Sequence, residues 1–346
     1  MRLPIRLLFF CLSLLSLPAL AAPVTGLYQV REPVADQQPE SRDAAMQKAL
    51  QTLVLRLTGD AKALQSAGLE GLRKDPQQIV SQYGYEGDAL LVEFDPASTD
   101  QQLRQAGLAL WGANRPVILT WWLNEAPEGS QLVGESQSAS ALLREAAQHR
   151  GLLLRLPLAD LSEQALGNAD VLLANDPQAL REASERYGAD ALLAVQATES
   201  GGSWQATWRL WLGDEREQGK AEGADQAALA DAVLLAVAER LAPRFVVKPG
   251  AAHSLTLVIE GADLGRFAAL ERLLEPFAAR LQEIDGQRLV YQVSASPEQL
   301  RAQLALGQLQ EVSEPLDAAA PPENPQEGAT EAPQVKPRTD QLRFRW

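Results

Sequence analysis

Stretches with the apolar spacing of helices alternate along the chain with short apolar stretches typical of strands. Apolar side chains recur every three or four positions over residues 41–59, which predicts an amphipathic helix that ends at a glycine. A short apolar strand over 89–94 and a second helix over 98–112 follow. The nearly unbroken apolar run 116–123 is typical of a strand covered on both faces. Strands that alternate with helices indicate an α/β layer.

The middle of the chain repeats this alternation. Residues 152–156 predict a short buried strand, and 177–188 predict a helix with a proline in its first turn and a glycine at its end. Two apolar stretches, 191–198 and 204–212, are separated by Ser-Gly-Gly and so predict a hairpin. The helix that follows is expected to stop at Pro243, because proline cannot donate a helical hydrogen bond.

The third stretch has the clearest pattern. Residues 255–260 alternate between core and surface as a half-buried strand does, and a helix with one apolar face covers 267–277. The dipeptide Asp285-Gly286 predicts a tight turn between two strands. A helix over 297–307 and a closing strand over 309–313 complete the order β-α-β-β-α-β, which is typical of a ferredoxin-like sandwich.

We therefore expect a mixed α/β and α+β protein of three small α/β domains and a tail. The domains are placed at residues 22–130, 136–247 and 254–313, and the last of them is the ferredoxin-like one. The tail, 314–346, is acidic and rich in proline. It is predicted to be disordered up to its terminal aromatic segment, because such a composition cannot bury enough apolar surface.

The first 21 residues have the features of a cleaved secretory signal peptide. Arg2 and Arg6 precede an apolar run over 7–17, and the small residues after it fit cleavage after Ala21. The run is too short to cross a bilayer, which needs about 20 apolar residues, and no second run of that kind follows. We expect a periplasmic protein with no stable membrane span after cleavage.

Charge and cysteine content narrow the range of partners. The formal charge is −14, and loss of Arg2 and Arg6 with the signal peptide changes it from −14 to −16. This charge repels phosphate backbones, so nucleic acid is not an expected partner. The single cysteine, Cys11, lies in the signal peptide. The mature chain would therefore contain no disulfide and no thiol nucleophile.

Residues that usually carry catalysis are scarce. His149 and His253 are the two histidines, and neither forms a metal-binding or nucleophile motif with another residue. The pair Gly201-Gly202 does not fit a nucleotide-binding loop. We expect no catalytic residue, no metal and no cofactor. One enzymatic alternative stays open, because a glycan hydrolase needs only two carboxylates and the chain has 45 acidic residues.

Aromatic residues are the candidates for binding a partner. Leu342, Phe344 and Trp346 alternate with arginines, which is typical either of a fraying tail or of an extended peptide that adds a strand to a sheet edge, on this chain or on another protein. Trp211 lies on the opposite side of its strand from Trp204 and the other core residues, so we expect it to be half exposed and available to a partner.

Several segments resemble the proteobacterial family called domain of unknown function 2066. The resemblance covers almost the whole mature chain and implies an exported protein, but that family has no established activity, so no site residue is carried over. The matching segments, besides the signal peptide, are 53–59 (Leu-Val-Leu-Arg-Leu-Thr-Gly), 116–123, 187–193 (Tyr-Gly-Ala-Asp-Ala-Leu-Leu), Gly201-Gly202, Trp204 and Trp208.

Two functions from different classes follow from these observations. The first is a non-catalytic accessory factor that binds an envelope protein through sheet edges and its C-terminal peptide. The second is a peptidoglycan-binding protein or a carboxylate-dependent glycan hydrolase, because the strand order of the third domain is shared by SPOR-type domains that bind peptidoglycan.

Overall fold

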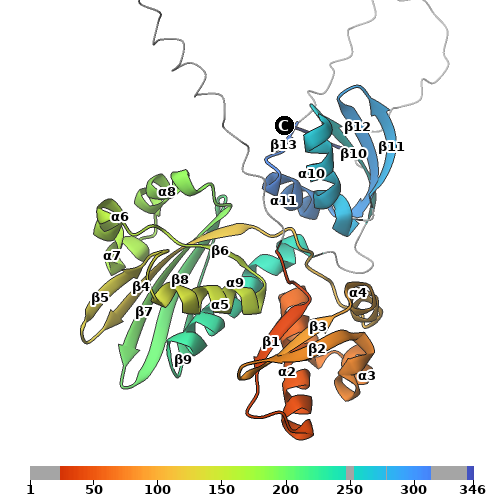
Figure 1. The fold of residues 1–346 in the computed structure, drawn as a ribbon. Helices are drawn as coiled ribbons and strands as arrows, with labels where there is room; N and C mark the ends of the chain where they lie inside the picture. Colours follow the sequence, from red (N-terminus) through yellow and green to blue (C-terminus); the bar gives the residue numbers. More distant parts are fainter. Residues whose placement is uncertain (1–23, 247–252, 278, 313–340) are drawn as a thin grey trace, which may run out of the picture.

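The structure is a computed structural model that describes residues 24–246, 253–277, 279–312 and 341–346. The described strands form three sheets and are accompanied by helices throughout, which confirms the mixed α/β and α+β class. The expected signal peptide, and the part of the tail expected to be disordered, lie outside the described residues. We call the parts built around the three sheets the first, second and third units (Figure 1).

The first unit is a three-stranded antiparallel sheet in the order β1-β3-β2, packed against the long helix α2. The helix ends where the sequence predicts, at Gly59, whose φ of 59° is a left-handed conformation that glycine adopts at little cost. The elements are β1 (Gln29–Pro33), α2 (Pro39–Thr58), η1 (Ala61–Gln65), η2 (Ala67–Leu69), α3 (Glu70–Lys74), η3 (Pro76–Ile79), β2 (Val80–Glu86), β3 (Ala89–Phe94) and α4 (Pro96–Gln105).

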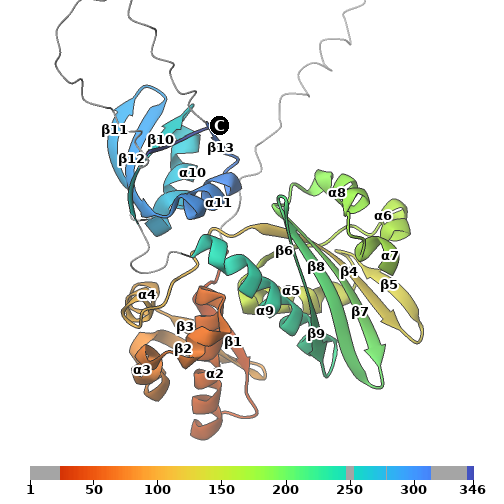
Figure 2. The same ribbon diagram turned by 180° about the vertical axis from the view of Figure 1, so that it is seen from behind.

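The second unit is a six-stranded sheet with helices on both faces (Figures 1 and 2). Its main path is β5-β4-β7-β8-β9, and β6 also pairs with β4. The elements are β4 (Val117–Ala126), β5 (Gly129–Val133), α5 (Ala139–Arg150), β6 (Leu153–Arg155), α6 (Leu161–Leu166), α7 (Ala169–Leu172), α8 (Gln178–Ser184), η4 (Glu185–Tyr187), β7 (Ala191–Ser200), β8 (Ser203–Leu212), β9 (Glu215–Gly223) and α9 (Gln226–Phe245).

The apolar strand 116–123 belongs to this second sheet and not to the first domain, where we expected it. It forms most of β4, which pairs in parallel with β7 over eight residues, from Ile118↔Ala191 to Glu125↔Thr198. Its predicted burial on both faces is confirmed, because α5 and α9 cover one face and the helices α6–α8 cover the other. Such a strongly apolar run does not indicate which sheet it will join, because either sheet would bury it.

One predicted helix end is also wrong. Pro243 does not stop the last helix of the second unit, because α9 continues through it to Phe245. Proline lacks the N–H that would bond one turn back, but the residues after it can still complete the turn. Val246 caps the end by donating its N–H to the carbonyl of Ala242.

The third unit has the predicted order of elements, with one addition. Its sheet runs β11-β12-β10-β14-β13, so the C-terminal strand β14 lies between β10 and β13, where a ferredoxin-like sheet would pair the first and last strands directly. Helices α10 and α11 cover one face. The elements are β10 (His253–Glu260), α10 (Leu264–Leu274), η5 (Glu275–Phe277), β11 (Arg280–Asp285), β12 (Arg288–Ala295), α11 (Pro297–Leu306), β13 (Gln310–Glu311) and β14 (Gln341–Arg345).

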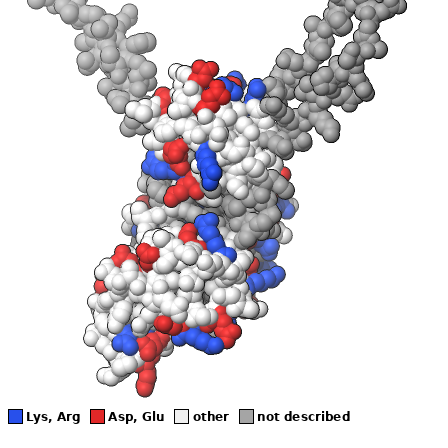
Figure 3. All heavy atoms as spheres, turned by 90° about the vertical axis from the view of Figure 1, so that its right-hand side faces the viewer, with Lys and Arg blue, Asp and Glu red and all other residues white. Residues whose placement is uncertain are grey.

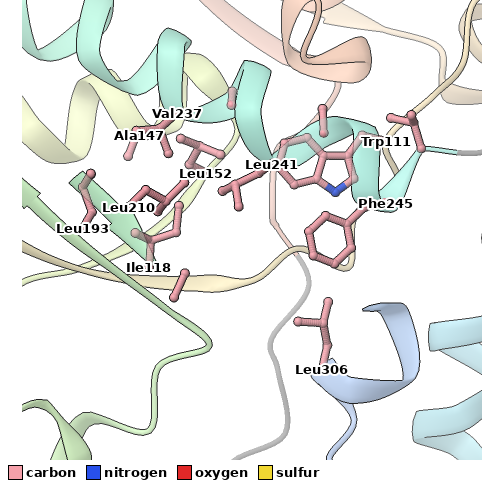
Figure 4. Close-up of a cluster of buried hydrophobic side chains, with 14 of the residues drawn as sticks. Trp111, Ile118, Ala147, Leu152, Leu193, Leu210, Val237, Leu241, Phe245 and Leu306 are labelled. Carbon is pink, nitrogen blue, oxygen red and sulfur yellow. The ribbon is translucent and has the colours of Figure 1, made fainter. Parts of the chain in front are cut away.

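The three units meet around the end of α9 (Figure 4). Trp111, from the end of the first unit, stacks on Phe245 with ring centroids 5.7 Å apart and an angle of 5° between the planes. Leu306 of α11 points toward the same phenyl ring. One continuous apolar core therefore extends from the second unit into the third.

Candidate protein-binding site

The C-terminal strand β14 is the best-defined peptide-binding arrangement in the described residues. It runs parallel to β10 over five register pairs, from Thr256↔Gln341 to Glu260↔Arg345. On its other side it runs antiparallel to the two-residue strand β13, and Val312 adds a bond from its N–H to the Arg343 carbonyl, 2.9 Å long. The sheet thus contains a slot, between β10 and β13, that holds an extended segment from both sides. We call it the terminal-strand slot.

The apolar side chains of this segment enter the core of the third unit. Leu342 and Phe344 lie beside Leu257 and Ile259 of β10, on the face that the helices cover, and Phe344 is only 2 % exposed. Trp346 packs against the same core. The period-2 pattern at the end of the sequence therefore does form a strand, and in this structure the strand adds to the sheet of its own chain.

Trp346 anchors the end of the strand in two further ways. Its indole Nε1 donates a hydrogen bond to the carbonyl oxygen of Gly307, 3.1 Å away, at the end of α11. The Arg266 guanidinium of α10 lies 5.5 Å from the centre of the indole ring, a cation–π distance. The indole of Trp346 is therefore held by packing against the core, by a hydrogen bond and by a cation–π contact.

Trp211, the other predicted binding residue, is not on the surface. It is 4 % exposed and lies in the small core between the sheet and helices α6–α8, so the expectation of half exposure is wrong. Alternation along β8 did place it opposite Trp204 and Trp208, which are 8 % and 1 % exposed on the other face. The sequence did not show that short helices would cover the second face as well.

A polar cluster joins the first and second units, and the sequence did not predict it. His149 of α5 lies with its Nδ1 2.7 Å from Asp231 Oδ1 of α9 and its Nε2 3.1 Å from the Thr52 hydroxyl of α2. The Glu32 carboxylate of β1 is 3.3 Å from the same Nε2. Arg150 also contacts Asp231. We call these five residues the His149 cluster.

The order Thr–His–Asp resembles a nucleophile triad, but the hydroxyl of Thr52 has a different hydrogen-bond acceptor from the one that a triad requires. The Thr52 hydroxyl donates its hydrogen to Glu32 Oε1, 2.5 Å away, and Thr52 is 6 % exposed. Burial opposes a charge on His149, but the hydrogen bonds to Asp231 and Glu32 outweigh it and raise the pKa of the imidazole. A raised pKa favours the protonated imidazole, which has no free nitrogen lone pair to accept a proton from a hydroxyl. The cluster is suited to holding two units together.

The two carboxylates of the cluster are stabilised as anions. Burial alone would raise the pKa of Glu32, but hydrogen bonds from His149 and Thr52 lower it below its ordinary value. Burial opposes ionisation of Asp231 in the same way, and His149 and Arg150 outweigh it. The His149 imidazole therefore lies between two carboxylates, that of Glu32 across the boundary and that of Asp231 within the second unit.

Two buried arginines complete this boundary. Arg115 is fully buried and donates to four carbonyl oxygens, whereas Arg56, 2 % exposed, donates to carbonyls of the first unit and to that of His149. Burial lowers the pKa of both guanidinium groups. The four acceptors of Arg115 are the carbonyls of Gly112, Gly151, Arg56 and Trp111.

A cleft of about 360 Å³ opens where the three units meet. Its lining includes Arg144, Gln148 and Asp190 from the second unit, together with Thr25 and Gln308 from the other two. Burial raises the pKa of Asp190, and the carboxylate accepts a 2.8 Å hydrogen bond from the N–H of Val117. That bond fixes the start of β4, so the carboxylate has a structural partner.

The described part of the chain contains no group of three or more histidine, cysteine or acidic residues arranged to hold a metal ion. Its helices include none that is long and apolar enough to cross a membrane. On the face shown in Figure 3, acidic and basic side chains are interspersed and neither sign forms one continuous patch.

Comparison with known proteins corrects the resemblance drawn above. The profile of a domain of unknown function, DUF8605, matches residues 21–112, which span the first unit and end before β4 begins. This is a different family from the 2066 family, so that resemblance is wrong. The repeated turns and apolar strands that suggested it are features that many α/β folds share. No curated protein and no solved structure matches the chain.

Proposed function

We propose that the chain is exported to the periplasm through a cleaved signal peptide and serves there as a non-catalytic factor that binds another envelope protein. The observation that carries this proposal is the terminal-strand slot, because strand addition is a common way to bind an extended peptide. Main-chain hydrogen bonds supply affinity in this mode, and pockets for alternate side chains supply specificity.

The slot also indicates what the partner must offer. The partner's segment should be extended and should carry apolar side chains at alternate positions, with an aromatic residue where Trp346 now contacts Gly307. Arg345 lies beside Glu260 in the register, so a basic residue is favoured there. The partner's segment replaces β14 when it binds. Until then β14 itself occupies the slot and competes with that segment.

A peptide-binding experiment tests this proposal. A chain truncated after Pro337 should bind a labelled peptide of residues 341–346, measured by fluorescence anisotropy, whereas the full chain should bind it much more weakly because the slot is occupied. A peptide with Phe344→Asp is the matched control and should not bind. A full-length Phe344→Asp variant provides a second open form in case truncation impairs folding. Failure of both open forms to bind, with native circular dichroism, would disprove the slot.

Two further measurements test the rest of the proposal. N-terminal sequencing of the protein from a periplasmic extract should begin at Ala22, and a chain that retains Met1 in the cytosol would contradict export. Crosslinking in the envelope should capture more partner with the truncated chain than with the full chain. Sedimentation with purified peptidoglycan sacculi, lost when residues 254–313 are removed, would support the glycan-binding alternative instead.

A further inference from the structure

The two sides of the third sheet are covered differently. One side ends in β13, which pairs with the chain's own terminus. The other side ends in β11, which pairs with β12 and with no other described strand, and all six of its residues are exposed. Both ribbon views draw β11 on the side of the third unit that points away from the second unit (Figures 1 and 2). The outward backbone groups of β11 are thus available to another strand.

A bulge gives β11 an apolar stripe. Leu281 and Ile284 are three positions apart, so in a regular strand they would point to opposite faces. The register shifts at Gln282, and as a result Leu281 lies opposite Tyr291 and Ile284 opposite Leu289, both of which face the helices. Leu281 and Ile284 are nevertheless 38 % and 62 % exposed. The stripe therefore continues the apolar core to the edge of the sheet.

The charged residues of β11 lie on the other face. Arg280 is opposite Gln292, and Asp285 is opposite Arg288. Glu283, between them, lies 3.7 Å from the Arg288 guanidinium in an ion pair within the chain. Arg280 and Asp285 thus stand at the two ends of the strand with opposite charges.

We infer that β11 is a self-association edge, at which β11 of a second copy of this chain adds in antiparallel orientation and joins two third sheets into one. The two-fold axis of this dimer lies between the two strands, at the level of the peptide bond between Gln282 and Glu283. Each residue of β11 then faces a complementary residue of the other copy, as an isologous contact requires. Apolar residues then face apolar residues, opposite charges face each other, and no like charges are opposed. The facing pairs are Arg280 with Asp285, Leu281 with Ile284, and Gln282 with Glu283.

β9, an edge strand of the second sheet, differs from β11 in its apolar content. β9 has acidic and basic residues along its length and none of the exposed large apolar side chains of the described chain. Its Glu215 contacts Arg244 of α9. β9 thus has no exposed apolar stripe like that of Leu281 and Ile284 to favour pairing with a second strand. The comparison favours β11 as the edge that accepts a second copy.

Sedimentation velocity of the mature full-length chain over a wide concentration range tests the contact, and a monomer–dimer equilibrium is expected. Arg280→Asp and Asp285→Arg should each weaken the dimer about ten-fold, because each places two like-charged pairs across the axis. Ile284→Lys should weaken it further. Lys220→Asp, a charge reversal on the exposed edge of β9, is the matched control and should leave the equilibrium unchanged.

Mixing provides the sharpest result. In a heterodimer of the Arg280→Asp chain with the Asp285→Arg chain, both charged pairs are attractive again, so the mixture should associate as tightly as the native chain. The double variant with both reversals should also recover. These recoveries separate a lost contact from a lost fold, since a misfolded chain would not regain association on mixing.

The outcomes are decisive in either direction. A native chain that stays monomeric over the whole concentration range would overturn the inference. So would a dimer whose dissociation constant is unchanged by all three substitutions in β11. The slot proposal is tested separately, because a chain truncated after Pro337 leaves β11 in place and should still dimerise if it folds. Dimerisation without peptide binding, or the reverse, would therefore show which of the two proposals has failed.

Discussion

The boundary between the first and second units is polar, whereas the C-terminal strand is held in the third unit mainly by apolar side chains and a backbone ladder. Glu32 and Thr52 of the first unit contact His149 across the boundary, Asp231 contacts the same imidazole from the second unit, and two buried arginines lie at this boundary. Phe344 and its neighbours contribute burial and register pairs instead. Apolar contacts depend little on pH, but the polar contacts depend on the protonation of every member. The stability of the boundary should therefore depend on pH, whereas that of the C-terminal strand should depend on it little.

Removal of the most deeply buried charge should have the largest effect. Arg115→Leu removes the donor from four carbonyls, three of them in buried contacts, and we expect a loss of about 4 kcal/mol in the free energy of unfolding. Urea denaturation measures it. Arg104→Leu is the control, because this exposed arginine pairs with Asp100 on the surface and should change stability by about 0.5 kcal/mol or less. Equal losses in the two variants would mean that the guanidinium of Arg115 does not support the boundary.

Truncation of the buried aromatic residue of β14 should cost somewhat less. Phe344→Ala removes a side chain that is 2 % exposed, and the expected loss is about 3 kcal/mol, with little change between pH 5 and pH 8. Thermal unfolding of the full chain measures it. Arg345→Ala, at the exposed neighbouring position, should have an effect within about 0.5 kcal/mol. A strand held only loosely would show similar small losses for both.

The sequence predicted the apolar half of this comparison better than the polar half. The alternation Leu342, Phe344 and Trp346 was enough to predict a strand, because period-2 burial is a local property of the chain. Its place between β10 and β13 could not be predicted, since any open edge would accept the same pattern. The helix order of the third unit was predictable for the same local reason, as its capping box at Ser296 shows.

The polar boundary could not be predicted from local pattern. Glu32, Thr52, His149 and Asp231 come from four elements that are far apart along the chain, and each is an ordinary polar residue in its own segment. A signal was present, however. His149 is one of two histidines, and it ends a helix beside Arg150 rather than in a loop. The packing of α5 against both α9 and α2, which brings these residues together, was the missing step.

The smallest expected effect is the pH dependence of the boundary, and its sign follows from the pKa directions. The pKa of His149 is raised, so its contribution is fully present below the ordinary value of 6.5 and is lost as the pH rises through the raised value. The pKa of Glu32 is lowered, so its contribution is present above the ordinary value of 4.5 and is lost in acid. The boundary should be strongest between these two values.

We therefore expect the native chain to lose about 1 kcal/mol of stability relative to a His149→Gln variant as the pH rises from about 5.5 to about 8.5. Urea denaturation of both chains across this range measures the difference, and His253, which both retain, cancels in the comparison. The Phe344→Ala variant should keep the native pH dependence, because its loss lies in the apolar contact. If the native chain instead gained stability over His149→Gln with rising pH, the imidazole would be neutral in the folded state. The cluster would then oppose protonation of His149, and the pH dependence of the boundary would have the opposite sign. Equal pH profiles for the two chains would mean that His149 gives the boundary no pH dependence.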